Sequence, residues 1–286
     1  MSLLDVLVLS IVQGFSELLP ISSSAHVIVA EKLMGFDPTR PDLTLLLVML
    51  HAGTMLSVLV YYWDSWKTNF FPSRRDFWNF AGLITLATAC TGAVGLILID
   101  FIEKYVLTNT PNPQIEDIFG NLSLMGIALG AMGLFILVSG LRQRQSSQPS
   151  ELGLKQSFWI GAVQGLCLPF RGFSRSGATI SAGLMLGSPQ RRVEEFSFAL
   201  AAVLSPLAIV WETWRLFTGP GSASLSLTSL AAAFGFSLLG LVLSFGTGLL
   251  ALKWLSKWLE RGWWPVFGLY CLLFAATVQT LYFVGF

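Results

Sequence analysis

The sequence predicts an all-α integral membrane protein. It would have six full transmembrane helices and two re-entrant helical hairpins, arranged as an inverted-topology repeat in one membrane domain over residues 1–286. Of these residues 54% are hydrophobic and only 12% are charged, about half the charge of an average soluble domain. The apolar stretches are continuous rather than alternating, which excludes a β-barrel. Because the net charge is +1, the chain has no basic surface for nucleic acid.

Six stretches are apolar over the roughly 20 residues that a bilayer-spanning helix needs. Tryptophans gather near the ends of these stretches, as expected for residues at the two membrane interfaces. The six predicted spans are Leu43–Trp63, Phe80–Phe101, Leu122–Leu141, Phe196–Phe217, Leu227–Trp254 and Trp264–Phe283.

Two further apolar regions are interrupted by polar, helix-breaking segments. Leu19–Ser24 divides the region Leu3–Leu33, and Pro169–Gly177 divides the region Phe158–Leu186. Each remaining piece is too short to span alone, and irregular backbone at membrane depth survives only when it is buried in protein or lines a wet cavity. We therefore interpret both regions as re-entrant hairpins. Two additional full spans are the alternative.

Short matches relate the two halves of the chain, about 1–145 and about 150–286. Each half would hold one hairpin and three spans, and because three is an odd number the second half would lie upside down relative to the first. The matches are Val12–Gly14 with Val163–Gly165, Ser22 and Ser24 with Ser174 and Ser176, Gly35 with Gly187, and Trp63–Trp66 with Trp211–Trp214.

The basic residues test this topology independently. One face of the predicted membrane domain carries Lys67, Arg74, Arg75, Arg142, Arg144, Lys155, Arg191, Arg192, Lys253, Lys257 and Arg261, whereas the other carries only Lys32, Arg40, Lys104 and Arg215. By the positive-inside rule the first face is cytoplasmic. Both termini and the first hairpin would then belong to the outer side, and the second hairpin would enter from the cytoplasm.

The first interruption carries polar residues that lipid tolerates poorly, which makes them functional candidates. Gln13 and Glu17 are four residues apart and share one helix face. A desolvated carboxylate needs a cation, a hydrogen-bond donor or a proton. A divalent cation such as Mg²⁺ would satisfy Glu17 if substrate phosphate oxygens completed its coordination. A carboxylate held only by packing hydrogen bonds is the alternative.

A serine and a histidine in the same segment suggest a nucleophile and its base. Ser22 or Ser23 would be activated by His26 if the imidazole lay within hydrogen-bond reach, and the spacing does not choose between the two serines. A metal-activated water with His26 as base would use the same residues. His51 lies inside a predicted span and either faces the same cavity or makes a helix–helix hydrogen bond.

The second interruption has the composition of an anion site. Arg175 supplies a guanidinium fork suited to phosphate oxygens. Ser174, Ser176 and Thr179 add hydroxyl groups, and the helix that follows presents its N-terminus. We therefore expect a cradle for phosphate or pyrophosphate.

If the two interruptions meet at the bilayer midplane, these groups share one cavity. The combination predicts hydrolysis of a phosphoester or phosphoanhydride whose lipid tail stays in the membrane. A lipid-carrier flippase or secondary transporter is the alternative, because inverted repeats with broken helices are typical of transporters. A PAP2-type lipid phosphatase fits less well, since no histidine lies between Gly177 and Gly187.

Two motifs resemble those of the BacA-type undecaprenyl-diphosphatase family. Gln13–His26 reads QGFSELLPISSSAH and is similar to the family's (E/Q)xxxE…PxSS…H motif, and Gly172–Thr179 reads GFSRSGAT and is similar to PGxSRSxxT. The resemblance covers nearly the whole chain, including the order of the spans. It implies an inverted repeat with two re-entrant hairpins. It also implies removal of the terminal phosphate of undecaprenyl diphosphate, which recycles the lipid carrier of peptidoglycan synthesis and confers bacitracin resistance.

The resemblance also implies roles for individual residues. It implies a divalent cation (Mg²⁺ or Ca²⁺) at Glu17 and Gln13, Ser23 as nucleophile and His26 as base, with Arg175 acting in catalysis. His51 and Arg171 are accessory candidates. The residues expected to bind the substrate phosphate are Ser22, Ser174, Arg175, Ser176 and Thr179.

The expected partners are a lipid-linked diphosphate and the bilayer of the bacterial cytoplasmic (inner) membrane. The active site would open to the periplasmic or outer side. The sequence leaves the oligomeric state open, with a homodimer among the options.

Three positions depart from the family pattern. Gln13 stands where many members have glutamate, which removes one candidate metal ligand. Arg171 stands where the second motif usually has proline, so it adds a cation beside the cradle and loosens the turn. Ser24-Ala25 replaces a common Thr-Gly. A diverged paralogue acting on another lipid phosphate is therefore an alternative.

Overall fold

The computed structural model describes residues 2–36, 41–108, 114–143, 152–218 and 227–285. Within these ranges every regular element is helical, which confirms the all-α prediction. The elements are α1 (Leu3–Leu18), α2 (Ser23–Leu33), α3 (Pro41–Asn69), α4 (Arg74–Tyr105), the 3₁₀ helix η1 (Ile115–Ile118), α5 (Leu122–Gln143), α6 (Leu154–Leu166), α7 (Arg175–Met185), α8 (Gln190–Thr218), α9 (Leu227–Glu260) and α10 (Trp264–Phe283).

Six of the described helices are long and apolar enough to cross a membrane, and they are the six predicted from the sequence: α3, α4, α5, α8, α9 and α10. The boundaries of α8 differ from the prediction. Its candidate span covers Gln190–Trp211, whereas the sequence predicted Phe196–Phe217. The helix begins earlier because Glu194 and Glu195, which lie outside the predicted span, are buried against α3 and α9.

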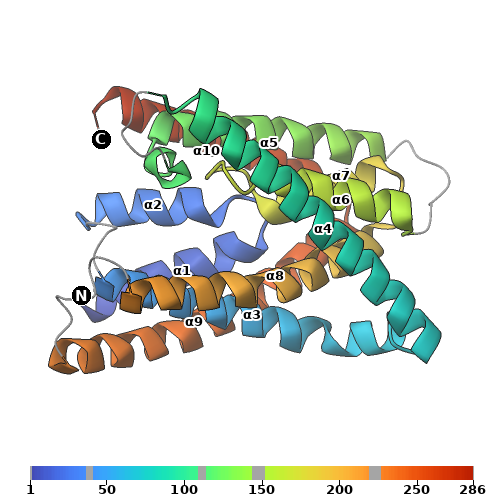
Figure 1. Ribbon diagram of the computed structural model, residues 1–286, viewed down its shortest axis with the longest axis horizontal. Helices are drawn as coiled ribbons and strands as arrows, with labels where there is room; N and C mark the ends of the chain where they lie inside the picture. The colour runs from blue at the N-terminus through green and yellow to red at the C-terminus, as the bar shows by residue number, and fades with distance from the viewer. Residues whose placement is uncertain (1, 37–40, 109–113, 144–151, 219–226, 286) are drawn as a thin grey trace.

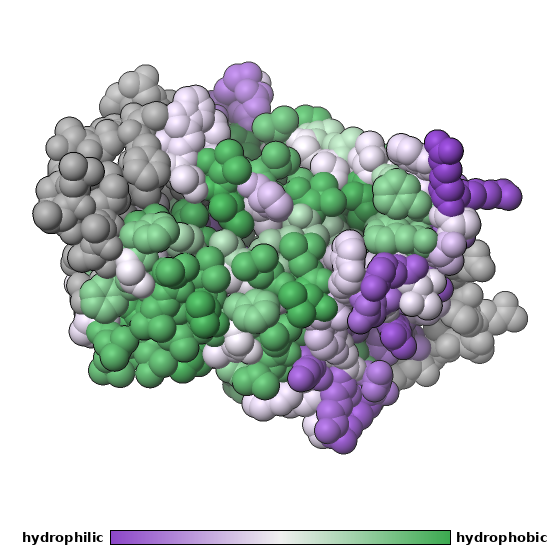
Figure 2. Space-filling view, turned by 90° about the horizontal axis from the view of Figure 1, so that it is seen from below, coloured by the Kyte–Doolittle hydropathy of each residue, from purple (hydrophilic) through white to green (hydrophobic). Residues whose placement is uncertain are grey.

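The outer surface of the helices is apolar. For example, Leu96, Ile97 and Leu207 are between 66% and 70% exposed. Proteins in water rarely expose apolar surface of this extent. Figure 2 shows hydrophobic side chains covering much of one face, with hydrophilic side chains gathered mostly toward one end. Together with the six long apolar helices, this surface makes the chain a multi-pass membrane protein.

Two helix pairs contain the predicted interruptions. α1 and α2 pack against each other across a break at Leu19–Ser22, and α6 and α7 do the same across a break at Cys167–Ser174. With 16, 11, 13 and 11 residues, these helices are each shorter than the roughly 20 residues of a full span. Each pair folds back on itself (Figure 1). Pro20–Ser22 of the first break and Pro169, Gly172 and Ser174 of the second are buried.

Long helices from the two halves of the chain interlock around these pairs. α5 packs on α10, α3 on α9, α1 on α9 and α4 on α6. Small residues allow the close approach: a Cβ atom added to Gly161 of α6 would lie 2.2 Å from the Ala87 carbonyl oxygen of α4. Helix association in membranes depends on such close packing, because lipid removes most of the hydrophobic driving force between helices.

The helices run along the long axis of the molecule, and their basic ends coincide. α1 begins and α10 ends at one end of this axis, whereas the α3–α4 and α9–α10 connections lie at the other (Figure 1). The basic residues of the predicted cytoplasmic face flank that second end: Lys67 near the end of α3, Arg74 and Arg75 at the start of α4, Arg142 at the end of α5, Lys155 at the start of α6, and Arg191 and Arg192 at the start of α8. Arg40 and Arg144 lie outside the described residues.

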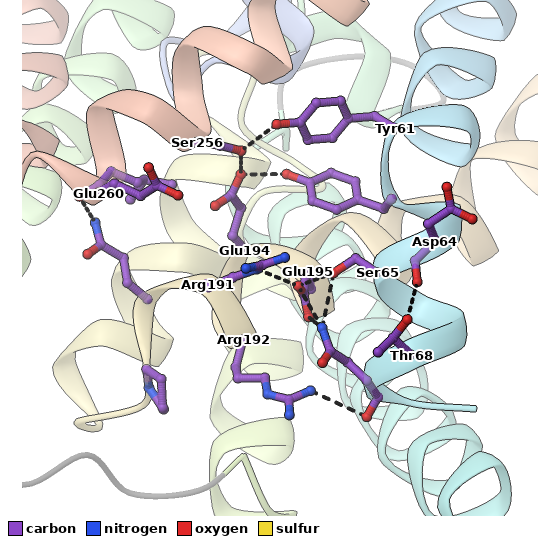
Figure 3. A pocket seen from close by; sticks show the side chains of 15 residues that line it. Tyr61, Asp64, Ser65, Thr68, Arg191, Arg192, Glu194, Glu195, Ser256 and Glu260 are labelled. Carbon is purple, nitrogen blue, oxygen red and sulfur yellow. Dashed lines mark hydrogen bonds and ion pairs between the residues drawn. The ribbon is translucent and has the colours of Figure 1, made fainter. Parts of the chain in front are cut away.

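A polar cavity of about 1010 Å³ opens between α3, α8 and α9 at this basic end. Glu194 accepts hydrogen bonds from the hydroxyls of Tyr62 and Ser256, and Glu195 accepts them from Ser65, Asn69 and Arg191 (Figure 3). Both glutamates are at least 96% buried. Hydrogen-bonded partners make such burial tolerable, so these carboxylates tie α8 to α3 and α9.

Candidate active site

The Glu17 carboxylate, in the last turn of α1, is where the two helix breaks meet. Its Oε2 accepts hydrogen bonds from Ser23 Oγ at 2.6 Å and from Gln13 Nε2 at 3.1 Å. Its Oε1 accepts one from Arg175 Nη2 at 2.9 Å. Arg175 and Glu17 are mostly buried, with side chains 23% and 16% exposed. A cation and two neutral donors from both halves of the chain thus converge on one carboxylate.

The first break places the Ser23 hydroxyl within hydrogen-bond distance of Glu17. α1 ends at Leu18 because Pro20 has no N–H and disfavours a helical conformation at the residue before it. Ser22 follows with φ +69°, the one non-glycine residue of positive φ in the described ranges, and its hydroxyl accepts a hydrogen bond from the Ala25 N–H at the start of α2. Strained backbone of this kind costs about 1–3 kcal/mol and tends to occur at functional sites.

The second break places the Arg175 guanidinium within hydrogen-bond distance of the same carboxylate. Ser174 caps α7 by accepting a hydrogen bond from the Gly177 N–H, so Arg175 is the first residue of the helix. Gly172 has φ +108°, and a Cβ atom there would lie 2.4 Å from the Met125 carbonyl oxygen, so the turn requires glycine. The guanidinium Nη1 of Arg175 is buried and has no hydrogen-bond partner among the described residues. It is therefore available to a ligand oxygen.

Two helix N-termini meet at this carboxylate. Ser23 and Arg175 are the first residues of α2 and α7, and both donate to Glu17. The first turn of α7 also touches the first break, since Ser176 Oγ donates to the Leu19 carbonyl at 3.3 Å. Helix N-termini concentrate unpaired N–H groups and positive dipole ends, so the arrangement suits an anion such as phosphate.

The hydroxyls predicted to bind phosphate also make hydrogen bonds within the protein. Thr179 is fully buried and its Oγ1 contacts the Arg175 carbonyl at 2.9 Å and Ser197 Oγ at 2.6 Å. Ser22 and Ser174 cap α2 and α7, and Ser176 bonds to Leu19. These four side chains shape the cradle, whereas Ser23 and Arg175 present their polar atoms to Glu17.

The sequence predicted His26 as the base beside Ser22 or Ser23, and it left His51 either in the same cavity or in a helix–helix hydrogen bond. His26 does not pair with Ser23: its Nδ1 contacts the Ser22 carbonyl at 2.8 Å, its Nε2 contacts the Tyr270 hydroxyl at 2.7 Å, and its ring stacks on Phe274 with centroids 4.0 Å apart. His51 Nε2 lies 3.7 Å from Glu17 Oε2. In this arrangement the base within reach of the Ser23 hydroxyl is Glu17.

His26→Ala is expected to destabilise the protein by about 2 kcal/mol, because it removes a hydrogen bond and a stacked ring between α2 and α10 and a second hydrogen bond to the Ser22 carbonyl. His51→Ala should change stability by less than about 0.5 kcal/mol, because that side chain is 47% exposed. Thermal unfolding of the two purified variants in the same detergent measures both effects. Equal unfolding temperatures for His26→Ala and the wild type would contradict the α10 contact.

Oxygen ligands for a cation are present beside Glu17, in small number. Gln13 Oε1 is buried and has no hydrogen-bond partner among the described residues. Amide and carboxylate oxygens are the ligands that Mg²⁺ and Ca²⁺ prefer. The described residues hold no group of three or more His, Cys, Asp or Glu side chains placed for a metal. The site thus fits a cation that takes part of its shell from phosphate oxygens.

The sequence analysis did not single out two polar residues of the helices around the site. Tyr270 of α10 makes a hydrogen bond with His26, and Glu31 of α2 is buried. Glu31 had a signal in the sequence, since it is an acid within an apolar stretch. Tyr270 had none, because a single tyrosine within the apolar span Trp264–Phe283 does not indicate which distant side chain it meets.

The fold and the site together define a helical, multi-pass membrane protein in which a largely buried carboxylate, Glu17, contacts Ser23 and Arg175 where two helix pairs meet. A family model described as "Bacitracin resistance protein BacA" matches residues 6–277. The chain belongs to this family.

Curated relatives extend over nearly the same length. The chain is 52% identical over 285 residues to "Undecaprenyl-diphosphatase 2" of Acinetobacter baylyi, a match that covers 98% of each chain. It is 34% identical over 286 residues to "Undecaprenyl-diphosphatase 1" of Burkholderia pseudomallei, with 96% of this chain and 94% of the relative covered. It is 29% identical over 272 residues to "Undecaprenyl-diphosphatase" of Rhodopirellula baltica, with 94% of each covered.

Proposed function

We propose that this protein hydrolyses the terminal phosphate of undecaprenyl diphosphate, releasing undecaprenyl phosphate and inorganic phosphate. The names of its full-length relatives support the substrate. The observation that carries the chemistry is the Glu17 carboxylate, which contacts a serine hydroxyl on one side and an arginine on the other. Recycling of the cell-wall lipid carrier and bacitracin resistance follow from this reaction.

In the proposed reaction Ser23 is the nucleophile and Glu17 its base. Ser23 Oγ forms a bond to the terminal phosphorus as its proton passes to Glu17 Oε2, 2.6 Å away, and the bond to the bridging oxygen breaks to release undecaprenyl phosphate. Water then attacks the phosphoserine. The phosphorus–Oγ bond breaks, Oγ recovers the proton from Glu17, and the phosphate leaves as dihydrogen phosphate.

Arg175 and the two helix N-termini would bind the phosphate oxygens. The free Nη1 of Arg175 supplies a donor that is not used by the protein, while Nη2 stays with Glu17. Charge develops on these oxygens in the transition state, so fixed donors there stabilise it more than the ground state.

Gln13 Oε1 and the Glu17 carboxylate are the proposed protein ligands of a divalent cation, Mg²⁺ or Ca²⁺. When bound, such a cation neutralises the charge of a diphosphate and polarises its phosphoryl oxygens. The protein's own contribution is to hold these two oxygens one helical turn apart, on the face of α1 that meets Ser23.

We further propose that the helix pairs are re-entrant hairpins of an inverted repeat in the bacterial cytoplasmic membrane. Equivalent features support it: Ser22 and Ser174 cap α2 and α7, and Gly35 and Gly187 follow these helices with φ +71° and +78°. The packing of α1 on α9 also has a counterpart in that of α6 on α4. The α1–α2 pair would enter from the outer side, where the site would open.

Cysteine labelling tests this orientation. In a variant without Cys90, Cys167 and Cys271, we expect Asn121→Cys to react with an impermeant maleimide in intact cells, and Lys155→Cys to react only after the membrane is opened. The basis is the excess of arginine and lysine at the Lys155 end. The reverse labelling pattern would overturn the orientation.

Phosphate release by the purified protein tests the function. With undecaprenyl diphosphate in detergent and Mg²⁺ or Ca²⁺ present, we expect steady release that EDTA stops and added cation restores. The alternative is a flippase or transporter for a polyprenyl phosphate, which would move the lipid across reconstituted vesicles without releasing phosphate. Transport by wild-type protein with no phosphate release would favour that alternative and contradict hydrolysis.

A further inference from the structure

His26 lies between the first break and α10, and each of its ring nitrogens has a partner. Nδ1 lies 2.8 Å from the Ser22 carbonyl oxygen, and Nε2 lies 2.7 Å from the Tyr270 hydroxyl. A carbonyl oxygen only accepts, so in the neutral imidazole the proton is on Nδ1 and the Tyr270 hydroxyl donates to Nε2. The reaction proposed above uses neither His26 nor Tyr270.

The Ser22 carbonyl belongs to the peptide unit that leads into Ser23. Ser22 has φ +69°, a conformation that persists only where the surrounding structure holds it. Its carbonyl oxygen accepts a hydrogen bond from the His26 backbone N–H at 3.3 Å and a second one from the His26 ring. Because a peptide unit is planar, these contacts fix the plane from which the Cα atom of Ser23 departs. The direction of the Ser23 hydroxyl, 2.6 Å from Glu17 Oε2, depends on that plane.

α10 supplies the support for the His26 ring. The imidazole stacks on Phe274 with centroids 4.0 Å apart and lies nearly parallel to the Tyr270 ring, with 9° between the two planes. The next residue of α10, Cys271, contacts the Pro20 carbonyl oxygen at 3.4 Å. α10 itself packs along α5. The first helix pair is therefore held against α10 at two points, one on each side of Ser22.

We propose that Tyr270 is a positioning residue for the nucleophile: through His26 it holds the Ser22–Ser23 peptide, so that the Ser23 hydroxyl stays on Glu17. Without the Tyr270 donor, the imidazole proton is free to move to Nε2, and Nδ1 then presents a lone pair to the Ser22 carbonyl. Two acceptors that face each other make no hydrogen bond, so the strained peptide loses its restraint. The activity arm of this inference rests on the proposed phosphatase function.

Tyr270→Phe tests the hydroxyl alone, because the ring and its stacking remain. We expect kcat for phosphate release to fall about tenfold with KM changed less than about twofold, because Ser23 is displaced while the groups that bind phosphate stay in place. Tyr282→Phe is the matched control. It makes the same change near the end of α10, where the ring contacts Phe283, and should leave kcat and KM unchanged.

A cycle with His26 distinguishes positioning through the imidazole from a general effect on folding. His26→Phe keeps an aromatic ring against Phe274 and removes both nitrogen atoms, so it should lower kcat at least as far as Tyr270→Phe does. If Tyr270 acts through His26, adding Tyr270→Phe to His26→Phe should change kcat by less than about twofold further.

Hydrogen exchange gives a readout that needs no turnover. In Tyr270→Phe, the backbone amides of residues 23–26 should exchange at least about fivefold faster than in the wild type, because the first turn of α2 loses its restraint. In Tyr282→Phe they should exchange at the wild-type rate. Mass spectrometry of the peptide that covers the first break measures this in the same detergent.

Three results would overturn the inference. Wild-type kcat and exchange in Tyr270→Phe would show that the hydroxyl holds nothing. A raised KM at unchanged kcat would mean that the hydroxyl contacts the substrate instead. A double variant whose loss equals the product of the two single losses would mean that Tyr270 does not act through His26. A wild type that released no phosphate would contradict the proposed function, whereas the exchange rates would still decide whether Tyr270 restrains the first break.

Discussion

Ser23→Ala is expected to lower kcat for phosphate release by at least about 10⁴-fold, because it removes the attacking oxygen from the site. KM should change little, since the phosphate oxygens would still meet Arg175 and the helix N-termini. The measurement is steady-state phosphate release, combined with an acid quench of the wild type during turnover. Phosphate on a peptide that contains Ser23 is the expected covalent product.

Ser24→Ala is the matched control for that variant. Ser24 is the next residue on α2, but its hydroxyl accepts a hydrogen bond from Gly172 and makes none with Glu17. Its loss should cost less than about tenfold in kcat. A Ser23→Ala variant with wild-type turnover and no trapped phosphoserine would contradict the serine nucleophile and favour an activated water.

Arg175→Lys is expected to lower kcat/KM by about 10³-fold. The arginine places Nη2 on Glu17 and leaves the buried Nη1 for a ligand. A lysine has a single ammonium on a flexible stem, so it cannot hold both positions in a fixed fork. The measurement is phosphate release as a function of substrate concentration, with the folded state checked by thermal unfolding.

Arg142→Lys makes the same chemical change at the exposed end of α5, away from the site, and should leave kcat/KM unchanged. If Arg175→Lys also retained wild-type kcat/KM, the fork would have no part in binding phosphate. Loss of activity in both variants would point to a general intolerance of the substitution.

The helices could be predicted because their signals are local. Six apolar stretches exceed the length of a membrane crossing, and Pro20 and Gly172 mark the two breaks. The start of α8 could not be predicted in the same way. Its first turns carry Arg191, Glu194 and Glu195, and a cluster of charged residues is typical of a loop. In the folded chain the two glutamates accept hydrogen bonds from hydroxyl and amide groups of α3 and α9, which the sequence does not show.

The site was predictable as a set of residues and less so as a set of contacts. Polar residues in two breaks identified Glu17, Ser23 and Arg175, and the structure brings these three together. The partner of Ser23 was wrongly expected to be His26, because closeness in sequence does not say which way a side chain turns. On α2 His26 faces Tyr270 of α10, more than 240 residues away in sequence.

Arg171 is a second residue whose contacts could not be predicted from the sequence. The sequence identified it as a departure from the family motif but offered no partner. In the structure its guanidinium lies over the ring of Phe119, 4.5 Å from the centroid and more than 50 residues earlier in the chain. Contacts of this kind between distant segments leave no periodic pattern in the sequence.

The central claim is that Glu17 from the first helix pair and Arg175 from the second act as one unit. The direct measurement is kcat/KM for phosphate release from the wild type, Glu17→Gln, Arg175→Gln and the double variant. If the two groups act together, each single variant should lose about 10³-fold and the double variant about tenfold more at most. A double variant whose loss equals the product of the two single losses would contradict the claim.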